Sequence, residues 1–350
     1  MSILKKTATL LIILIITISC KSDDVELPLG DYENGFFIAN EGPFSNGTGT
    51  LTFIGNDGAI EQDVYQAVNN EVLGNIVQSM TFHNNNAYIV VNNSHKIIVV
   101  NRHTMKKITT IEGSNINNPR YFVAVGNTGY VSNWGSTSSS TDDYIAVIDL
   151  STNTVTSTIP VGEGPEDMLV KDNTIYANLQ GGFGFNNKIE VIDTDTNTIS
   201  TTITVGDVPN AILKDNNGAI WVLCSGNPNY ATGGETNGKL IKIENNSVTS
   251  TLDFGTQKHP SHLTINENNL YYNLGGKVYS MLVSSNQLNT NAIAGFDGFY
   301  YTMKAKDGVL YTTNAGDFAS EGILKVFNLN TNEYSYSKTT GIVPTAVVFQ

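Results

Sequence analysis

Cysteine and charge are both scarce in this 350-residue chain. The two cysteines, Cys20 and Cys224, are too few for the disulfide framework of a small secreted domain. Cys224 lies in the apolar stretch IWVLC, so we expect a buried, unreactive thiol. Only 15% of residues are charged, and 19 basic residues face 32 acidic ones, for a formal net charge of −13. No basic stripe is present, which argues against nucleic acid as a partner.

Catalytic signatures are also missing. The sequence has no Gly-x-Ser-x-Gly elbow, no phosphate-binding loop, no Cys-x-x-Cys pair and no His-Glu-x-x-His motif. We therefore expect a protein that is not an enzyme, with no catalytic residues, no metal site and no cofactor. A lyase or hydrolase is the least favoured alternative.

The N-terminus is typical of a secretory signal. Lys5 and Lys6 precede the apolar run Leu10–Ile16, and a short segment leads from there to Cys20. The apolar run is shorter than a transmembrane helix requires. We assign residues 1–19 to a signal peptide.

Cys20 directly follows Ser19, an arrangement that resembles a bacterial lipobox and implies cleavage before Cys20 and lipidation of its sulfur. An ordinary signal peptide with an incidental cysteine is the alternative. Residues 20–31 then form the lipidated N-terminus and a flexible tether. The start of this tether, Lys21–Asp24, resembles the surface-export signal of some outer-membrane lipoproteins. The resemblance implies an outer-membrane, cell-surface location in which only the lipid anchor touches the membrane.

A repeat organises the rest of the chain. Tyr144–Glu166 recurs almost intact as Ile189–Asn210. The period is set by prolines 46, 44 and 51 residues apart, at Pro119, Pro165, Pro209 and Pro260. A repeat of about 40–50 residues is the length of one four-stranded propeller blade.

Each repeat has the pattern of four strands with alternating apolar residues, joined by turns rich in Asn, Asp and Thr. The chain begins with a second strand, FFIAN (36–40), and ends with a first strand, AVVFQ (346–350). Pairing of these segments would close a ring and remove free sheet edges. The sequence predicts an all-β fold over residues 32–350: a seven-bladed β-propeller of four-stranded antiparallel blades. An open solenoid is the alternative, and a short helical turn is expected only within Asp63–Val77.

The second strands carry a Tyr-Val-Thr-Asn-like signature, closest at Tyr130–Asn133 and Tyr311–Asn314. With Val147–Asp149 and the exit Ile159–Pro165, it resembles YncE-like propellers built from YVTN repeats. Such a propeller behind a lipidated cysteine also resembles the surface cobalamin-binding lipoproteins of Bacteroides-type bacteria. That resemblance implies a corrinoid ligand and a TonB-dependent outer-membrane transporter as partner. The pattern weakens at Gly298 and Lys239–Asn245.

The prolines also predict a ring of polar side chains. In a propeller, the link from one blade to the next crosses toward the axis, so the residues after the prolines should surround a central channel. They are Arg120, Glu166, Asp167, Asn210, His262 and Thr345, with Gln78 and Ser79 from the blade that lacks the proline. This set could orient a large polar ligand or simply solvate a wet channel. His259 and His262 could be ligands of a metal or cofactor, but we favour polar residues near the channel mouth.

Aromatic residues recur in the loops that follow the second strands, on the same expected face. Rings on loops around a polar funnel can cover a flat ligand, with amides fixing its orientation. Packing of loop against loop is the alternative. The predicted binding residues from these loops are Asn40, Glu41, Phe44, Asn133, Trp134, Gln180, Phe183, Phe185, Tyr230, Asn314, Asp317 and Phe318.

These observations lead to one functional hypothesis and one alternative. We expect a non-enzymatic surface lipoprotein that binds a large ligand, a corrinoid above all, on the funnel face and passes it to the transporter. The alternative is an adhesin or scaffold that binds protein or glycan through the same loops. The sequence contains no motif diagnostic of a corrinoid.

Overall fold

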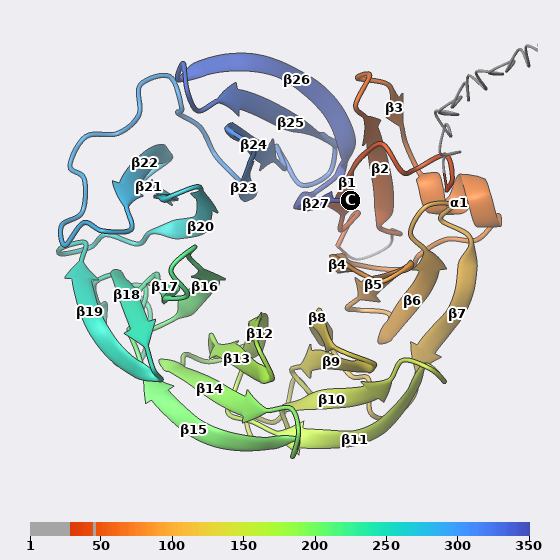
Figure 1. The fold of residues 1–350 in the computed structure, drawn as a ribbon, viewed down its shortest axis with the longest axis horizontal. Coiled ribbons are helices and arrows are strands. Elements are labelled where there is room, and N and C mark those ends of the chain that lie inside the picture. Colours follow the sequence, from red (N-terminus) through yellow and green to blue (C-terminus); the bar gives the residue numbers. More distant parts are fainter. Residues whose placement is uncertain (1–28, 45–46) are drawn as a thin grey trace, which may run out of the picture.

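The computed structural model describes residues 29–44 and 47–350. The predicted signal peptide, the lipidation site Cys20 and most of the predicted tether lie outside these residues. Within them, the chain forms a ring of seven sheets around a central axis (Figure 1). The predicted seven-bladed β-propeller is confirmed.

Each blade runs from an inner strand at the axis to an outer strand at the periphery. The inner strands are β27 (Pro344–Phe349), β4 (Val77–His83), β8 (Pro119–Val125), β12 (Pro165–Lys171), β16 (Pro209–Lys214), β20 (Ser261–Asn266) and β23 (Thr302–Lys306). The second strands are β1 (Gly35–Asn40), β5 (Asn86–Val91), β9 (Thr128–Asn133), β13 (Thr174–Leu179), β17 (Ile220–Cys224), β21 (Asn269–Leu274) and β24 (Val309–Asn314). The third strands are β2 (Thr50–Gly55), β6 (Lys96–Asn101), β10 (Tyr144–Asp149), β14 (Lys188–Asp193), β18 (Lys239–Glu244), β22 (Lys277–Leu282) and β25 (Glu321–Asn328). The outer strands are β3 (Ile60–Glu61), β7 (Lys107–Glu112), β11 (Thr154–Pro160), β15 (Thr198–Thr204), β19 (Ser247–Asp253) and β26 (Glu333–Ile342).

The ring is closed by the two ends of the described chain. The C-terminal strand β27 pairs antiparallel with β1, with Phe36 opposite Phe349 and Ile38 opposite Val347. Gln350 then donates a hydrogen bond to the Tyr32 carbonyl oxygen at 2.8 Å. This pairing confirms the predicted closure and satisfies the inner edge of β1.

The sixth blade, β20 to β22, is the exception to the four-strand pattern. After β22 the chain is rich in Asn and Ser and forms only a bridge between Lys277 and Asp297, with Ile293 and Phe296 bonded to Val278. Phe296 is fully buried there. A buried phenylalanine in an irregular segment therefore takes the place of an outer strand. The one helix in the described part, α1 (Val64–Asn69), lies within Asp63–Val77 as predicted.

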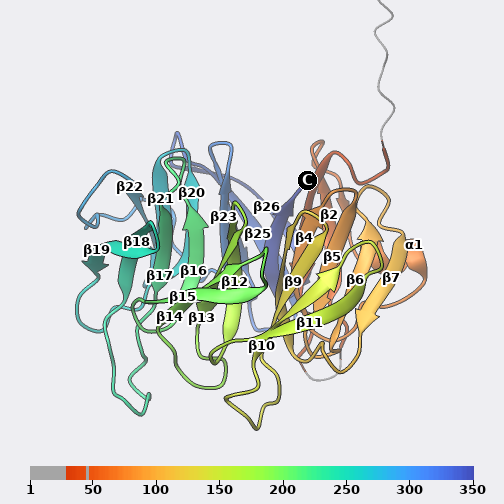
Figure 2. The ribbon, with the colours of Figure 1, turned by 60° about the horizontal axis from the view of Figure 1, so that its bottom comes forward.

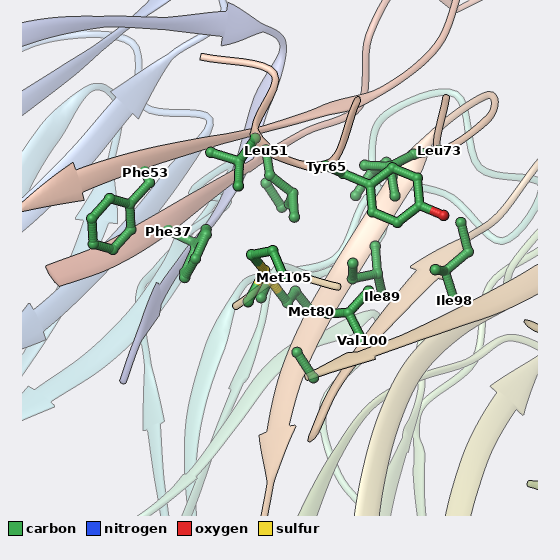
Figure 3. Close-up of a cluster of buried hydrophobic side chains, with 14 of the residues drawn as sticks. Phe37, Leu51, Phe53, Tyr65, Leu73, Met80, Ile89, Ile98, Val100 and Met105 are labelled. Carbon is green, nitrogen blue, oxygen red and sulfur yellow. The ribbon is translucent and has the colours of Figure 1, made fainter. Parts of the chain in front are cut away.

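The hydrophobic core consists of separate clusters, each lying between two neighbouring blades, because each sheet packs its two faces against the sheets on either side. Figure 3 shows one such cluster, in which Phe37 and Leu51 of the first blade meet Met80 and Ile89 of the next. Burying a side chain of this size stabilises the fold by about 1.5–3 kcal/mol. Cys224 is likewise fully buried, and burial raises the pKa of its thiol to about 12, so the thiol is inert as expected.

The ring has two distinct faces. The long loops after β9 and β17 extend below the ring in Figure 2, and we call this the funnel face. The opposite, distal face carries the turns between the inner and second strands. The described chain begins on the distal face, where the Tyr32 N–H donates to the His103 carbonyl oxygen at 3.0 Å.

Candidate ligand-binding funnel

A cavity of about 1410 Å³ runs along the axis and is walled by the inner strands. It exceeds the roughly 300–1,000 Å³ of pockets for drug-sized ligands, so it has room for a larger molecule. Ring residues predicted from the prolines line it, as do loop residues from the funnel face. The predicted residues among its lining are Glu41, Phe44, Gln78, Ser79, Arg120, Trp134, Asp167, Gln180, Phe183, Asn210, His262, Phe318 and Thr345.

A buried ion pair forms one side of the ring. Arg120 donates from Nη2 to Oε1 of Glu166 at 2.8 Å and from Nε to the same carboxylate at 3.0 Å. Its Nη1 donates to the Gln78 side-chain oxygen at 2.6 Å. Burial by itself would raise the pKa of the Glu166 carboxyl and lower that of the guanidinium. The bidentate contact counters both effects, so we treat the pair as ionised.

Aromatic rings pack against this ion pair on the side of the funnel face. The Trp134 ring lies under the Arg120 guanidinium, 4.0 Å from ring centroid to Cζ, and its Nε1 donates to the Pro165 carbonyl oxygen at 3.1 Å. The Phe183 ring packs edge-on against Trp134 with centroids 5.4 Å apart. The cation and the hydrogen bond hold Trp134 in place, and Phe183 remains 55% exposed above it.

A second aromatic group lies in the wall near Glu41. The Tyr301 hydroxyl donates to Oε1 of Glu41 at 2.9 Å, and its ring is in edge contact with Phe318, with centroids 5.7 Å apart. Burial raises the pKa of the Glu41 carboxyl, although the hydrogen bond from Tyr301 opposes this shift. Phe318 also contacts Phe299, and both rings are exposed.

We call Phe44, Trp134, Phe183 and Phe318 the aromatic rim, because all four line the cavity mouth. Phe44 is 80% exposed and Phe318 is 48% exposed. Exposed apolar rings that gather around a cavity mark an interaction site more often than rings scattered singly over a surface. The rim is therefore a candidate ligand-contact surface.

Several predicted residues do not line the cavity. Glu166 is one of them: it is buried and bonds Arg120 at 2.8 Å instead of facing the channel. Asn40 and Asn133 are fully buried, and each uses its amide within the scaffold: Asn133 Nδ2 donates to the Val131 carbonyl oxygen at 2.8 Å. Asn314 and Asp317 accept loop N–H groups, such as Gly316 N–H to Asn314 Oδ1 at 2.7 Å. Phe185 and Tyr230 are exposed and contact each other outside the cavity lining, with centroids 6.3 Å apart.

The histidines are held by polar neighbours. His259 contacts the Ser225 carbonyl oxygen through Nδ1 at 2.8 Å and Glu235 Oε1 through Nε2 at 2.9 Å. His262 lines the cavity and its Nε2 donates to the Tyr300 carbonyl oxygen at 2.9 Å. Burial lowers the pKa of His262 and favours its neutral form. Across residues 29–44 and 47–350, no group of three or more His, Cys, Asp or Glu side chains gathers as a metal site would require.

Sequence reasoning missed most of the inner-strand residues that line the cavity, and the polar ones among them include Tyr121, Tyr301 and Lys304. All three lie on inner strands or just before them. The signal that could have found them is strand alternation, because residues on either side of a buried inner-strand position face the channel.

Gly164 fixes how closely the Phe183 loop approaches the ring. Its φ is +72°, and a Cβ added there would lie 2.0 Å from the Gly182 nitrogen. We expect Gly164→Ala to lower the free energy of unfolding by more than about 2 kcal/mol, because backbone atoms must move. Gly126→Ala is the matched control, since its φ is +57° and nothing lies within 4 Å. Urea unfolding of both variants measures the difference, and equal losses would contradict the close approach.

Asp143 connects the loop after β9 to this segment, because its Oδ2 accepts the Gly164 N–H at 2.6 Å. Burial raises the pKa of its carboxyl to about 6. A carboxyl whose pKa is raised on folding stabilises the fold most below its unfolded value near 4, and this contribution is lost as pH rises through 6. We expect Asp143→Asn to increase the free energy of unfolding at pH 7.5 by about 1–2 kcal/mol and to have little effect at pH 4. Urea unfolding at both pH values checks this, and a pH-independent effect would refute it.

Seven blades around an axial cavity with an aromatic mouth define the class: the protein is a seven-bladed β-propeller with a funnel-shaped cavity. Residues 34–319 match the family described as Domain of unknown function (DUF5074), and the chain belongs to this family. A comparison with curated proteins finds no match. In the described part of the chain, no helix has the length and apolar character needed to cross a bilayer.

Solved structures with the same fold are only distantly similar in sequence. The periplasmic gluconolactonase PpgL of Pseudomonas aeruginosa is 10% identical, with 90% of this chain and 99% of that chain covered and a TM-score of 0.63. The computationally designed Ika8 protein is 13% identical, with 89% and 91% covered and a TM-score of 0.58. Apo AztD from Citrobacter koseri is 11% identical, with 89% and 96% covered and a TM-score of 0.54. At these identities the similarity shows the fold alone.

Proposed function

We propose that this protein is a lipid-anchored outer-membrane protein that binds a corrinoid in the funnel and delivers it to an outer-membrane transporter. The observation that carries the proposal is the aromatic rim over a cavity of about 1410 Å³. A corrin ring is broad and flat, so aromatic side chains can cover it. Each such contact contributes about 0.5–1.5 kcal/mol beyond the buried area.

Amide groups in the cavity wall support the same ligand class, because a corrin ring carries amide side chains around its edge. Gln180 lines the cavity. Asn210 also lines it, donates from Nδ2 to the Pro260 carbonyl oxygen at 3.2 Å, and has a buried Oδ1 that lacks a partner among the described residues. A buried acceptor without a partner costs free energy, which a ligand N–H would recover.

The charged groups of the funnel favour binding over catalysis. The Arg120 guanidinium and the Glu166 carboxylate bond each other, and Glu41 is bonded by Tyr301. Asp167 and Lys304 also line the described cavity wall. Asp167 accepts the Met168 N–H at 2.9 Å, and neither side chain is hydrogen-bonded to a hydroxyl or thiol nucleophile there. We therefore propose a carrier that does not transform its ligand.

The placement of the two faces supports delivery at the cell surface. The described chain begins on the distal face, at the contact of Tyr32 with His103. An anchor attached through this end would leave the funnel directed away from the membrane. The loops that carry Trp134, Phe183 and Tyr230 would then be accessible to a ligand and to a transporter partner.

Calorimetric titration of the protein with cyanocobalamin tests the proposal. We expect saturable heat with micromolar or tighter affinity and a stoichiometry of one. Absence of heat at micromolar protein would overturn the corrinoid proposal. A pull-down from envelope extracts complements the titration: recovery of a TonB-dependent transporter supports delivery, whereas a glycan or matrix protein alone would support the adhesin alternative.

A further inference from the structure

One of the cationic side chains in the described cavity wall forms no ion pair. Only two Lys or Arg side chains line the described cavity wall, Arg120 and Lys304. Arg120 is neutralised by Glu166 at 2.8 Å. Lys304, by contrast, is in none of the ion pairs found among residues 29–44 and 47–350.

Lys304 is directed into the channel by strand alternation. Its neighbours on β23, Met303 and Ala305, are both buried against adjacent blades, whereas Lys304 is exposed. The channel lining also includes the apolar side chains Leu213, Ile265 and Val348. An ammonium group in such a wall attracts an anion more strongly than it would on an open surface, because fewer waters compete.

We propose that Lys304 forms a subsite for a phosphodiester group of the bound ligand. This subsite lies inside the channel, on the inner strand β23, whereas the aromatic rim lies on the loops at the channel mouth. The inference deepens the proposed function: a cobalamin carries one phosphodiester in its nucleotide loop, whereas cobinamide lacks that loop. The rim would cover the flat ring while Lys304 fixes which end of the ligand enters the channel. Charge-assisted contacts of this kind give orientation as well as affinity.

Asp167 is the group that competes with the ligand for Lys304. It faces the channel from β12, and its charge interacts with Lys304 from β23, with Tyr121 from β8 and with Glu166 on its own strand. Burial raises the pKa of the Asp167 carboxyl to about 6. Above pH 6 the carboxylate attracts Lys304 and repels an anion, and below pH 6 the neutral acid does neither. A phosphodiester stays singly charged over this range, so its affinity should rise as pH falls from 7.5 to 5.

The first arm compares two corrinoids by calorimetry on the full-length protein in detergent. Lys304→Met should weaken cyanocobalamin roughly ten- to hundredfold and leave dicyanocobinamide unchanged. Asp167→Asn should remove the pH dependence and strengthen cobalamin binding at pH 7.5. Equal effects of Lys304→Met on both corrinoids, or none on either, would overturn the subsite. Circular dichroism confirms that each variant is folded.

The second arm does not depend on corrinoid binding, so the subsite and the proposed function can fail separately. Acetylation of individual lysines is followed by mass spectrometry with increasing diethyl phosphate. The diester should slow acetylation of Lys304 in a saturable way and leave the exposed Lys258 unchanged. If cobalamin does not bind but Lys304 is protected, the corrinoid proposal fails and the subsite stands. An unprotected Lys304 overturns the subsite.

Discussion

Deleting residues 344–350 is expected to abolish cooperative unfolding of the whole propeller. These residues form β27, which pairs with β1 and buries Val347 and Phe349 against the first and seventh blades. Phe349 alone contacts Phe36 and Tyr311, with centroids 5.5 and 5.0 Å apart. Loss of several such side chains, at about 1.5–3 kcal/mol each, approaches the total stability of about 5–15 kcal/mol of a typical domain.

Urea unfolding and size-exclusion chromatography measure this effect. The truncated chain should give no sigmoidal transition and should elute as aggregate, because β1 then presents a free edge. The matched control is a circular permutant that places residues 344–350 ahead of residue 29, which restores β27 beside β1. The permutant should unfold cooperatively. A truncated chain with an unchanged midpoint would show that closure by β27 does not stabilise the ring.

Replacing Glu166 by alanine while Arg120 remains is expected to lower the free energy of unfolding by about 3–5 kcal/mol. The substitution leaves a buried guanidinium with only Gln78 as a side-chain hydrogen-bond partner, and a buried charge without its counterion is strongly unfavourable. The double variant Arg120→Met with Glu166→Leu should recover much of the loss, because neither charge remains.

Urea unfolding of the single and double variants measures the coupling. The control is Glu71→Ala, which breaks the exposed pair with Lys107 at 2.7 Å and should cause a far smaller loss. If Glu166→Ala lowered the free energy of unfolding as little as Glu71→Ala, Arg120 would be solvated rather than buried. The Arg120–Glu166 pair would then not be a rigid part of the channel ring.

The fold was predictable because its signals recur. Proline spacing, the duplicated Tyr144–Glu166 segment and the mismatched phase of the two chain ends specify seven closed blades. The missing outer strand of the sixth blade was not predictable, because residues 283–299 still contain the apolar positions Ile293 and Phe296. In the structure these residues do not form an outer strand. Instead Ile293 and Phe296 form backbone hydrogen bonds with Val278, and Phe296 is buried there.

The candidate site was predictable where position alone directs the side chain. In the blades that have the proline, the inner strand begins at it or directly after it, which places Arg120 and Glu166 side by side on neighbouring inner strands. For an Asn at the end of a second strand, the sequence does not determine the direction of the side chain, because the residue is both the last of the strand and the first of the loop. Asn133 turns back into the blade, where its Oδ1 accepts the Asn117 N–H at 3.0 Å. Lys304 was overlooked because it lies two residues beyond the strand start rather than at the ring.

Binding of cyanocobalamin to a rim-deleted variant tests the central claim most directly. Phe44, Phe183 and Phe318 are replaced together by alanine, and Tyr334→Ala on the outer strand β26 serves as the control for an equally exposed ring. We predict that calorimetry shows the triple variant binding roughly 10- to 1,000-fold more weakly than the unmodified protein, with Tyr334→Ala unchanged. Unaltered binding by the triple variant, or an equal loss for Tyr334→Ala, would contradict the account.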